Sequence, residues 1–194
     1  MDRLPPIPPA QWSAAQRREA EAIIAGPRGA LLSPFVPLLR SPELMGHAQR
    51  MGEYLRYRSA LGQRLSELAI LLVARAWSQP VEWAIHAPIA AREGIAPETI
   101  AAIGEGRRPD ALAEDEAVVF DICGELERDA QVSDATWAAA IQHFGQQGTV
   151  DLIGLIGYYG LLAMVMNAAR TPSPGGPPLP QSPPSLRAGV NQQP

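Results

Sequence analysis

The sequence predicts an all-helical fold, and two observations lead to that prediction. Helix start and stop signals divide the chain between two proline-rich ends, and the alternating runs of β-branched residues that mark strands are absent. Hydrophobic residues make up 46% of the 194 residues and charged residues 19%, which is enough apolar material for a substantial core. A chain of this length is ordinarily one domain with tails.

We expect that domain to span residues 13–170. Residues 1–12, which contain several prolines, are predicted to be a flexible arm. Residues 171–194 are rich in proline, glycine, serine and glutamine, and such a segment buries too little apolar surface to offset its ordering entropy. We therefore predict a disordered tail.

The helix signals fall in order along the chain. Ser13 is suited to cap the first helix, and Gly26-Pro27 ends it. The next helix is predicted to start at Ser41-Pro42-Glu43, which supplies a cap, a proline at the first helical position and an acid in the first turn. The expected helices cover residues 13–24, 41–58, 62–77, 78–94, 97–104, 113–129, 133–145 and 149–170.

Two of these helices, at 62–77 and 149–170, are apolar around most of their girth, which predicts that they lie inside a core or an assembly. Leu152–Ala169 carries no formal charge, but it is slightly shorter and more polar than a membrane span of about 20 residues. We therefore expect a buried helix and no membrane contact. Glu67-Leu68 in one helix is weakly similar to Asp151-Leu152 in the other, which suggests a duplicated helical hairpin.

Composition excludes several kinds of chemistry. The chain contains no lysine, which excludes a lysine Schiff base, a lysine-anchored pyridoxal phosphate and a P-loop. Its one cysteine, Cys123, allows neither an intrachain disulfide nor a Cys-x-x-Cys pair. The net charge of −4 shows no basic excess for nucleic acid, and the first residues lack an apolar signal core, so we expect a cytoplasmic protein.

Glu67 is the first candidate for acid–base chemistry. It lies near the start of an apolar helix whose face continues with Leu71 and Ala74. Apolar surroundings disfavour a charged carboxylate, which is one way to obtain a proton donor or base near neutral pH. The alternative is an acid in the first helical turn that pairs with Arg64, and the spacing leaves both interpretations open.

Glu82 and His86 are four residues apart on the next helix and share one face. A carboxylate in that position orients an imidazole and stabilises its protonated form. An ordinary surface ion pair is the alternative. Pro88 leaves the Ala84 carbonyl without its helical donor, which predicts a kink beside His86. The two helices should pack antiparallel, but spacing alone leaves open whether Glu67 reaches the other two side chains.

These residues belong to a wider resemblance. The chain is similar to the carboxymuconolactone decarboxylase family over about residues 30–168, within the larger alkylhydroperoxidase-D-like superfamily. Glu67 followed by Glu82-Trp83-x-x-His86 is the most specific part of the likeness. Supporting segments are Tyr54-Leu55-Arg56 and residues 64–71, 74–77, 91–95, 132–136 and 155–159.

The resemblance implies an all-α bundle of helical hairpins that assembles into homotrimers or homohexamers. Alkylhydroperoxidase-D-like relatives carry Cys-x-x-Cys-x-x-x-His, with a glutamate upstream that corresponds to Glu67. Here those positions read Gln79-x-x-Glu82-x-x-x-His86. Both cysteines are missing, so we expect thiol-based peroxide reduction to be lost.

The decarboxylase branch of the family then implies a carboxy-lyase of aromatic-compound catabolism that acts on a small carboxylate or lactone without a cofactor. Glu67, Glu82 and His86 are the expected catalytic residues. Arg56 is the expected ligand of the substrate carboxylate, because a guanidinium matches carboxylate geometry, although a surface or interface arginine is the alternative. Three further hypotheses for the whole protein are an alkylhydroperoxidase-type enzyme, a two-glutamate, one-histidine metal site and a non-catalytic oligomeric binding protein.

Overall fold

The computed structural model describes residues 1–181, and within this range the chain forms helices and no strands. The all-helical prediction is therefore confirmed. A 3₁₀-helix, η1, covers Pro9–Gln11. The α-helices are α1 (Ala14–Ala25), α2 (Phe35–Leu38), α3 (Pro42–Tyr57), α4 (Gln63–Ala76), α5 (Pro80–Arg92), α6 (Pro97–Gly104), α7 (Glu114–Asp129) and α8 (Asp134–Ala169).

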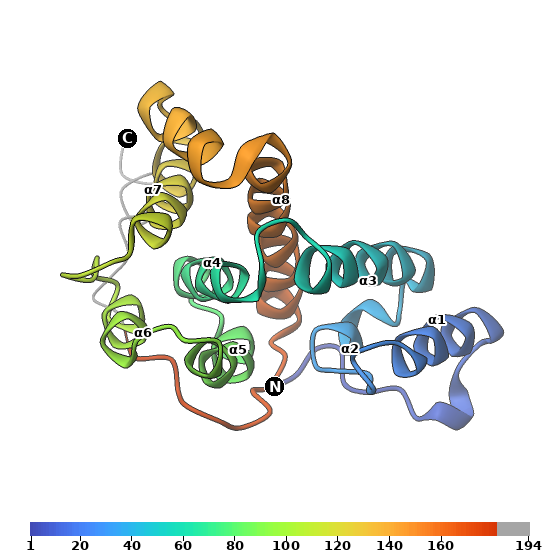
Figure 1. The fold of residues 1–194 in the computed structure, drawn as a ribbon. Helices are drawn as coiled ribbons and strands as arrows, with labels where there is room; N and C mark the ends of the chain where they lie inside the picture. Colours follow the sequence, from blue (N-terminus) through green and yellow to red (C-terminus); the bar gives the residue numbers. More distant parts are fainter. Residues whose placement is uncertain (182–194) are drawn as a thin grey trace, which may run out of the picture.

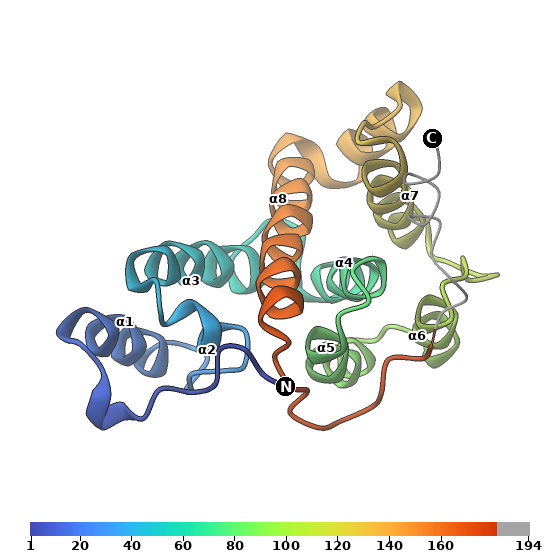
Figure 2. The ribbon, with the colours of Figure 1, turned by 180° about the vertical axis from the view of Figure 1, so that it is seen from behind.

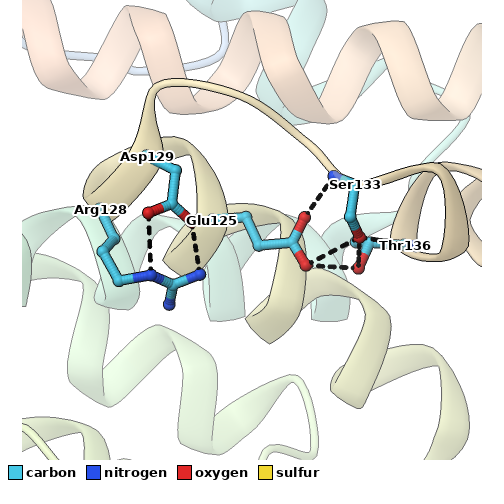
Figure 3. A network of polar contacts seen from close by, with 5 residues as sticks. All are labelled: Glu125, Arg128, Asp129, Ser133 and Thr136. Atoms are coloured by element: carbon cyan, nitrogen blue, oxygen red, sulfur yellow. Dashed lines mark hydrogen bonds and ion pairs between the residues drawn. The ribbon is translucent and has the colours of Figure 1, made fainter.

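Local sequence explains several helix boundaries, but the predicted cap at the start of α3 is absent, because the Ser41 side chain forms no capping hydrogen bond. Ser13 and Gln16 form a reciprocal capping box at the start of α1. Ser133 caps α8 by accepting a hydrogen bond from the Thr136 backbone N–H. Glu125, near the end of α7, accepts hydrogen bonds from the backbone N–H and hydroxyl of Ser133 and from the Thr136 hydroxyl, which ties the two helices together (Figure 3).

Helix α8 passes through the middle of the molecule. It separates α1, α2 and α3 from α4, α5 and α6 (Figure 1). In the opposite view α8 crosses in front of the α3–α4 connection (Figure 2). Helix α4 contacts α5, α6, α7 and α8, which explains why its sequence is apolar on nearly every side.

The last predicted pair of helices is one element with an interruption. Gly145 has φ 66° and ψ 178°, a conformation that is almost restricted to glycine, and it separates the α8 segment beside α7 from the long central segment (Figure 1). By length and composition α8 could cross a membrane, but half of its most apolar 18-residue window is buried within the described residues. A core helix passes the same test, so the finding is weak evidence for a membrane span.

Asp151, which begins the buried part of α8, holds the α3–α4 connection. Its carboxylate accepts hydrogen bonds from the Tyr54 hydroxyl at 3.0 and 3.1 Å and from the Ala60 backbone N–H at 2.9 Å. Gln147 donates in turn to the Tyr54 hydroxyl. The connection that leads into α4 is thereby fixed to the central helix.

Both proline-rich ends contact the helical domain. In the predicted flexible arm, the Arg3 backbone N–H donates to the Ala169 carbonyl at 2.8 Å, and Arg40 donates to the Pro5 carbonyl at 2.6 Å. In the predicted disordered tail, the Pro180 carbonyl accepts a hydrogen bond from Arg75 at 2.8 Å. Residues 171–181 form no helix or strand, and the predicted disorder of the tail stays a prediction, whereas residues 182–194 lie outside the described residues.

Candidate active site

The site is built on the α4–α5 hairpin, whose turn is fixed by amide side chains. Ser78 has a positive φ of 48°, which closes the turn. The buried Gln79 side chain accepts from the Val81 backbone N–H at 2.7 Å and donates to the Asn167 side chain at 2.8 Å. Asn167 also donates to the Trp77 carbonyl at 2.9 Å. The hairpin is thus locked to the end of α8.

The antiparallel hairpin brings the three predicted catalytic residues together. The Nδ1 atom of His86 lies 2.6 Å from Oε2 of Glu67, and its Nε2 atom lies 3.3 Å from Oε2 of Glu82. The side chains of Glu67 and Glu82 are 2% exposed and that of His86 is 4% exposed. Spacing along the sequence could not establish this convergence, and the structure supplies it.

The two simpler interpretations of these acids are wrong. Arg64 does not pair with Glu67, because it forms ion pairs with Asp115 and Glu116 at the start of α7. Glu82 and His86 do not form a surface pair, because both side chains are buried.

Arg56 reaches the site from α3. Its Nε atom lies 3.4 Å from Oε1 of Glu67, and its guanidinium carbon lies 5.2 Å from the centre of the Tyr57 ring. The side chain also borders the small cavity beside His86. The structure therefore assigns Arg56 a contact within the acid–base cluster, and its role as a substrate ligand stays a prediction.

The surroundings of His86 favour its protonated form. Burial lowers the pKa of the imidazole, but hydrogen bonds to Glu67 and Glu82 and the charges of these carboxylates outweigh burial, so the pKa is raised above its ordinary value of 6.5. An imidazolium donates from both ring nitrogens, which matches one carboxylate on each side. The arrangement is a buried imidazole between two carboxyl groups.

Two tyrosines of α8 complete the site. The Tyr159 ring packs edge-on against His86 with centroids 5.2 Å apart, and its hydroxyl lies 3.4 Å from Nε2. Tyr158 packs edge-on against Tyr159. Burial raises the pKa of Tyr158 to about 12, against the opposing effect of the Arg28 guanidinium, and raises the pKa of Tyr159 well above 10. Both hydroxyls therefore keep their protons at neutral pH.

A small cavity lies beside these groups. Its volume is about 20 Å³, which is room for about one water molecule. Three of the polar atoms around it, Nη1 of Arg28, Oε1 of Glu82 and the hydroxyl of Tyr158, are buried and have no hydrogen-bond partner among the described residues. Glu67 is not part of the lining. The lining residues are Arg28, Leu32, Pro34, Phe35, Arg56, Glu82, Ile85, His86, Tyr158, Tyr159 and Leu162.

The sequence prediction missed Arg28, Tyr158 and Tyr159. Arg28 follows Gly26-Pro27, a pair that indicates only the end of a helix. Tyr158 belongs to a pair of tyrosines in an otherwise apolar helix, and that pair is the signal that could have indicated a polar site. Nothing in the local sequence indicates that Arg28 lies beside the tyrosines of α8.

The alternative chemistries find little support in the geometry. In the part of the chain that the structure describes, no three His, Cys, Asp or Glu side chains are arranged to hold a metal ion. Cys123 lies on α7, outside the cavity lining, and burial raises the pKa of its thiol. A thiol of that kind is a poor nucleophile. No protein-family model matches this chain, and no curated protein matches it.

Proposed function

We propose that this protein is an acid–base enzyme of the carboxymuconolactone decarboxylase type, a carboxy-lyase or isomerase that acts on a small carboxylate or lactone without a cofactor. The observation that carries the proposal is a buried His86 held between Glu67 and Glu82 at the edge of a cavity. A buried histidine with a raised pKa and two carboxylate partners has the properties of a proton donor at neutral pH.

The positions of Glu67, Glu82 and His86 suggest a different role for each. Glu67 holds Nδ1 of His86 and lies behind the ring, so we propose that it acts as a positioning residue. Glu82 and Tyr159 both face Nε2 and both border the cavity. The Nε2–H of His86 is therefore the proton that a ligand in the cavity would meet.

In the proposed decarboxylation, the bond between carbon and the leaving carboxylate breaks and CO₂ departs. The electron pair enters a conjugated enone or lactone of the substrate, which serves as the electron sink. His86 then gives its Nε2 proton to carbon, and a proton from solvent restores the imidazolium, so that one proton is consumed for each CO₂ released. An isomerisation would use the same groups, with Glu82 removing a proton from one carbon and His86 returning a proton to another.

Substrate entry requires movement, because the free space beside His86 has room for about one water molecule. Leu32 and Pro34 of the α1–α2 connection border the cavity together with Arg28. We propose that this connection moves to admit the substrate.

The proposal also includes a fold family, an assembly, a location and a metabolic role. The α4–α5 hairpin and the paired carboxylates support an alkylhydroperoxidase-D-like helical bundle. We propose a homotrimer or homohexamer, a cytoplasmic location and a role in aromatic-compound catabolism. The mass of the purified protein in solution, measured by light scattering, tests the assembly.

The decisive experiment compares His86→Ala and Glu67→Gln with the wild type in decarboxylation and isomerisation assays on lactones and β-keto acids. His143→Ala, which removes an exposed histidine of α8, is the matched control. We expect His86→Ala to abolish measurable turnover. Glu67→Gln should lower kcat and move the pH profile, because a neutral amide no longer stabilises the imidazolium. Turnover that survives both changes would exclude the assigned roles.

A non-catalytic oligomeric binding protein is the second candidate, because the cavity beside His86 has room for about one water molecule and not for a substrate. Such a protein would show no turnover, either as the wild type or as His86→Ala. A thiol peroxidase would require turnover of an organic hydroperoxide that depends on Cys123, and the buried thiol disfavours that activity.

A further inference from the structure

Three residues that line the cavity each have a buried polar atom without a hydrogen-bond partner among the described residues. The atoms are Nη1 of Arg28, the hydroxyl of Tyr158 and Oε1 of Glu82. The Arg28 guanidinium is close enough to the Tyr158 hydroxyl to oppose the rise of its pKa. Buried polar atoms are nearly always hydrogen-bonded in folded proteins. Three of them in the lining of one cavity, from the α1–α2 connection, α5 and α8, therefore indicate a site for a polar group, and a ligand would enter it when that connection moves.

Two of the three atoms are hydrogen-bond donors suited to an anion. The guanidinium of Arg28 keeps its charge, and it is positioned over the Phe35 ring with its carbon 5.0 Å from the ring centre. Tyr158 keeps its proton, since burial raises its pKa to about 12. Arginine and a neutral hydroxyl together are a donor pair that fits the two oxygens of a carboxylate.

The charged side chains in the cavity lining also favour an anion. Two guanidinium groups, those of Arg28 and Arg56, border the cavity, together with one carboxyl group, that of Glu82. An anionic ligand would lie between the two arginines.

We propose that Arg28 and Tyr158 form the carboxylate-binding site of this protein, with Arg28 as the residue that determines specificity for acids. The inference rests on the proposed function, and it replaces the sequence-based expectation that Arg56, whose Nε contacts Glu67, binds the carboxylate. A carboxylate on this donor pair places the rest of the ligand beside Glu82 and His86, which line the same cavity. The free Oε1 of Glu82 then accepts from a proton-bearing group of the ligand.

The test is a binding measurement that needs no turnover. Benzoate and acetate are the carboxylate probes, and benzamide and acetamide are their neutral counterparts. Affinities are measured by calorimetry for the wild type, Arg28→Gln, Arg28→Lys and Tyr158→Phe. Arg18→Gln, which removes an exposed guanidinium of α1, is the matched control. Circular dichroism and the thermal midpoint confirm that each variant is folded.

We expect the wild type to bind benzoate in preference to benzamide and Arg28→Gln to lose about tenfold to a hundredfold in benzoate affinity, as for a charge-assisted hydrogen bond. Tyr158→Phe should lose about threefold to tenfold, and Arg28→Lys should be intermediate because lysine keeps the charge without the fork. Benzamide affinity should not change, and Arg18→Gln should behave as the wild type does.

An Arg28→Gln variant that is folded and binds benzoate as tightly as the wild type would overturn the inference, as would a wild type that binds neither carboxylate. The outcome is separate from that of the proposed function. Binding that depends on Arg28 in a protein without turnover would leave the inference standing and exclude the enzyme. Turnover that depends on His86, together with a benzoate affinity that is unchanged in Arg28→Gln, would support the enzyme and exclude the carboxylate-binding site.

Discussion

Two buried carboxylates occupy corresponding places in the two apolar helices, and their surroundings differ. Among the described residues, Asp151 of α8 accepts hydrogen bonds from the Tyr54 hydroxyl and the Ala60 backbone N–H. Glu67 of α4 contacts the imidazole of His86 and the guanidinium of Arg56. The faint similarity between Glu67-Leu68 and Asp151-Leu152 thus marks two acids that are buried for different purposes.

A structural acid and a candidate reactive acid differ in the partners that surround them. The partners of Asp151 are a tyrosine hydroxyl and a backbone N–H, and their hydrogen bonds fix a connection. The main partner of Glu67 is an imidazole, which changes charge near neutral pH, and it adjoins a cavity with unpartnered polar atoms. Burial alone would not distinguish the two sites.

The largest contrast is expected in activity. His86→Gln should lower kcat by about 10²–10⁴-fold, the usual contribution of a general acid or base. Asp151→Asn should leave kcat per folded molecule close to that of the wild type, because Asp151 does not line the cavity. Steady-state kinetics on the best lactone or β-keto acid substrate measures both. Equal losses in the two variants would contradict a functional difference between the two acids.

For stability, in contrast to activity, we expect a large effect of substituting Asp151. Asp151→Ala removes the acceptor of the Ala60 N–H and the Tyr54 hydroxyl, and we expect the free energy of unfolding to fall by about 3 kcal/mol. Urea denaturation followed by circular dichroism measures the change. Asp134→Ala, at the exposed start of the same helix, is the control and should cost less than about 1 kcal/mol. A loss of that small size in Asp151→Ala as well would show that the α3–α4 connection does not depend on Asp151.

A smaller effect is expected at Gly52 of α3, where the side chain of Tyr158 packs against the backbone. A Cβ atom on Gly52 would lie 2.2 Å from the Tyr158 hydroxyl oxygen. Gly52→Ala should therefore displace Tyr158 and cost about 1–3 kcal/mol of stability, as overpacking does. Benzoate affinity should fall in parallel with that of Tyr158→Phe. Gly157→Ala, where a Cβ meets nothing within 4 Å, is the control. Unchanged stability and affinity in Gly52→Ala would contradict the close packing.

The smallest effect is a pH dependence of stability at the Glu67 site. The pKa of His86 is raised in the folded protein by Glu67 of α4 and Glu82 of α5, against burial, while Tyr159 of α8 and Arg56 of α3 also face the cluster. The stabilisation is fully present below the unfolded pKa of about 6.5 and is lost as the pH rises through the folded pKa, by no more than about 1.4 kcal/mol per pH unit.

The stability gap between the wild type and His86→Gln should therefore narrow from pH 6 upward, measured by urea denaturation at each pH. The gap between the wild type and Asp151→Asn should stay constant over the same range, because the donors to Asp151 are a tyrosine hydroxyl and a backbone N–H and include no histidine. A gap for His86→Gln that widens with pH would mean that His86 is held neutral.

The sequence predicted the helices well because their signals are local. Capping at Ser13 and Ser133, and the break at Gly145, depend on neighbouring residues, and the structure shows all three. The short helix Phe35–Leu38 went unpredicted, because four residues around a proline are too few to show a period. The contacts of residues 1–12 and 171–181 were missed because they are made with distant residues and leave no periodic pattern.

The candidate site was predicted in part. Glu82 and His86 share a helix face by spacing, and the family resemblance added Glu67. Arg28 could not be predicted, because its place in the cavity depends on how the α1–α2 connection packs near Tyr158 and Tyr159 of α8. Such a contact is set by packing between elements far apart in the chain.

Pro88 has a consequence for the far end of the chain. It leaves the Ala84 carbonyl of α5 without a helical donor, and Gly176 lies so close to this oxygen that a Cβ atom would come within 2.9 Å of it. Gly176 has a φ of 108°, which other residues rarely adopt. A recombinant chain that stops at Arg170 would lose Gly176 beside the Ala84 carbonyl and the hydrogen bond between Arg75 and Pro180. The Ala84 carbonyl of α5 would then lack this neighbour. The last segment is therefore best kept in any truncation series.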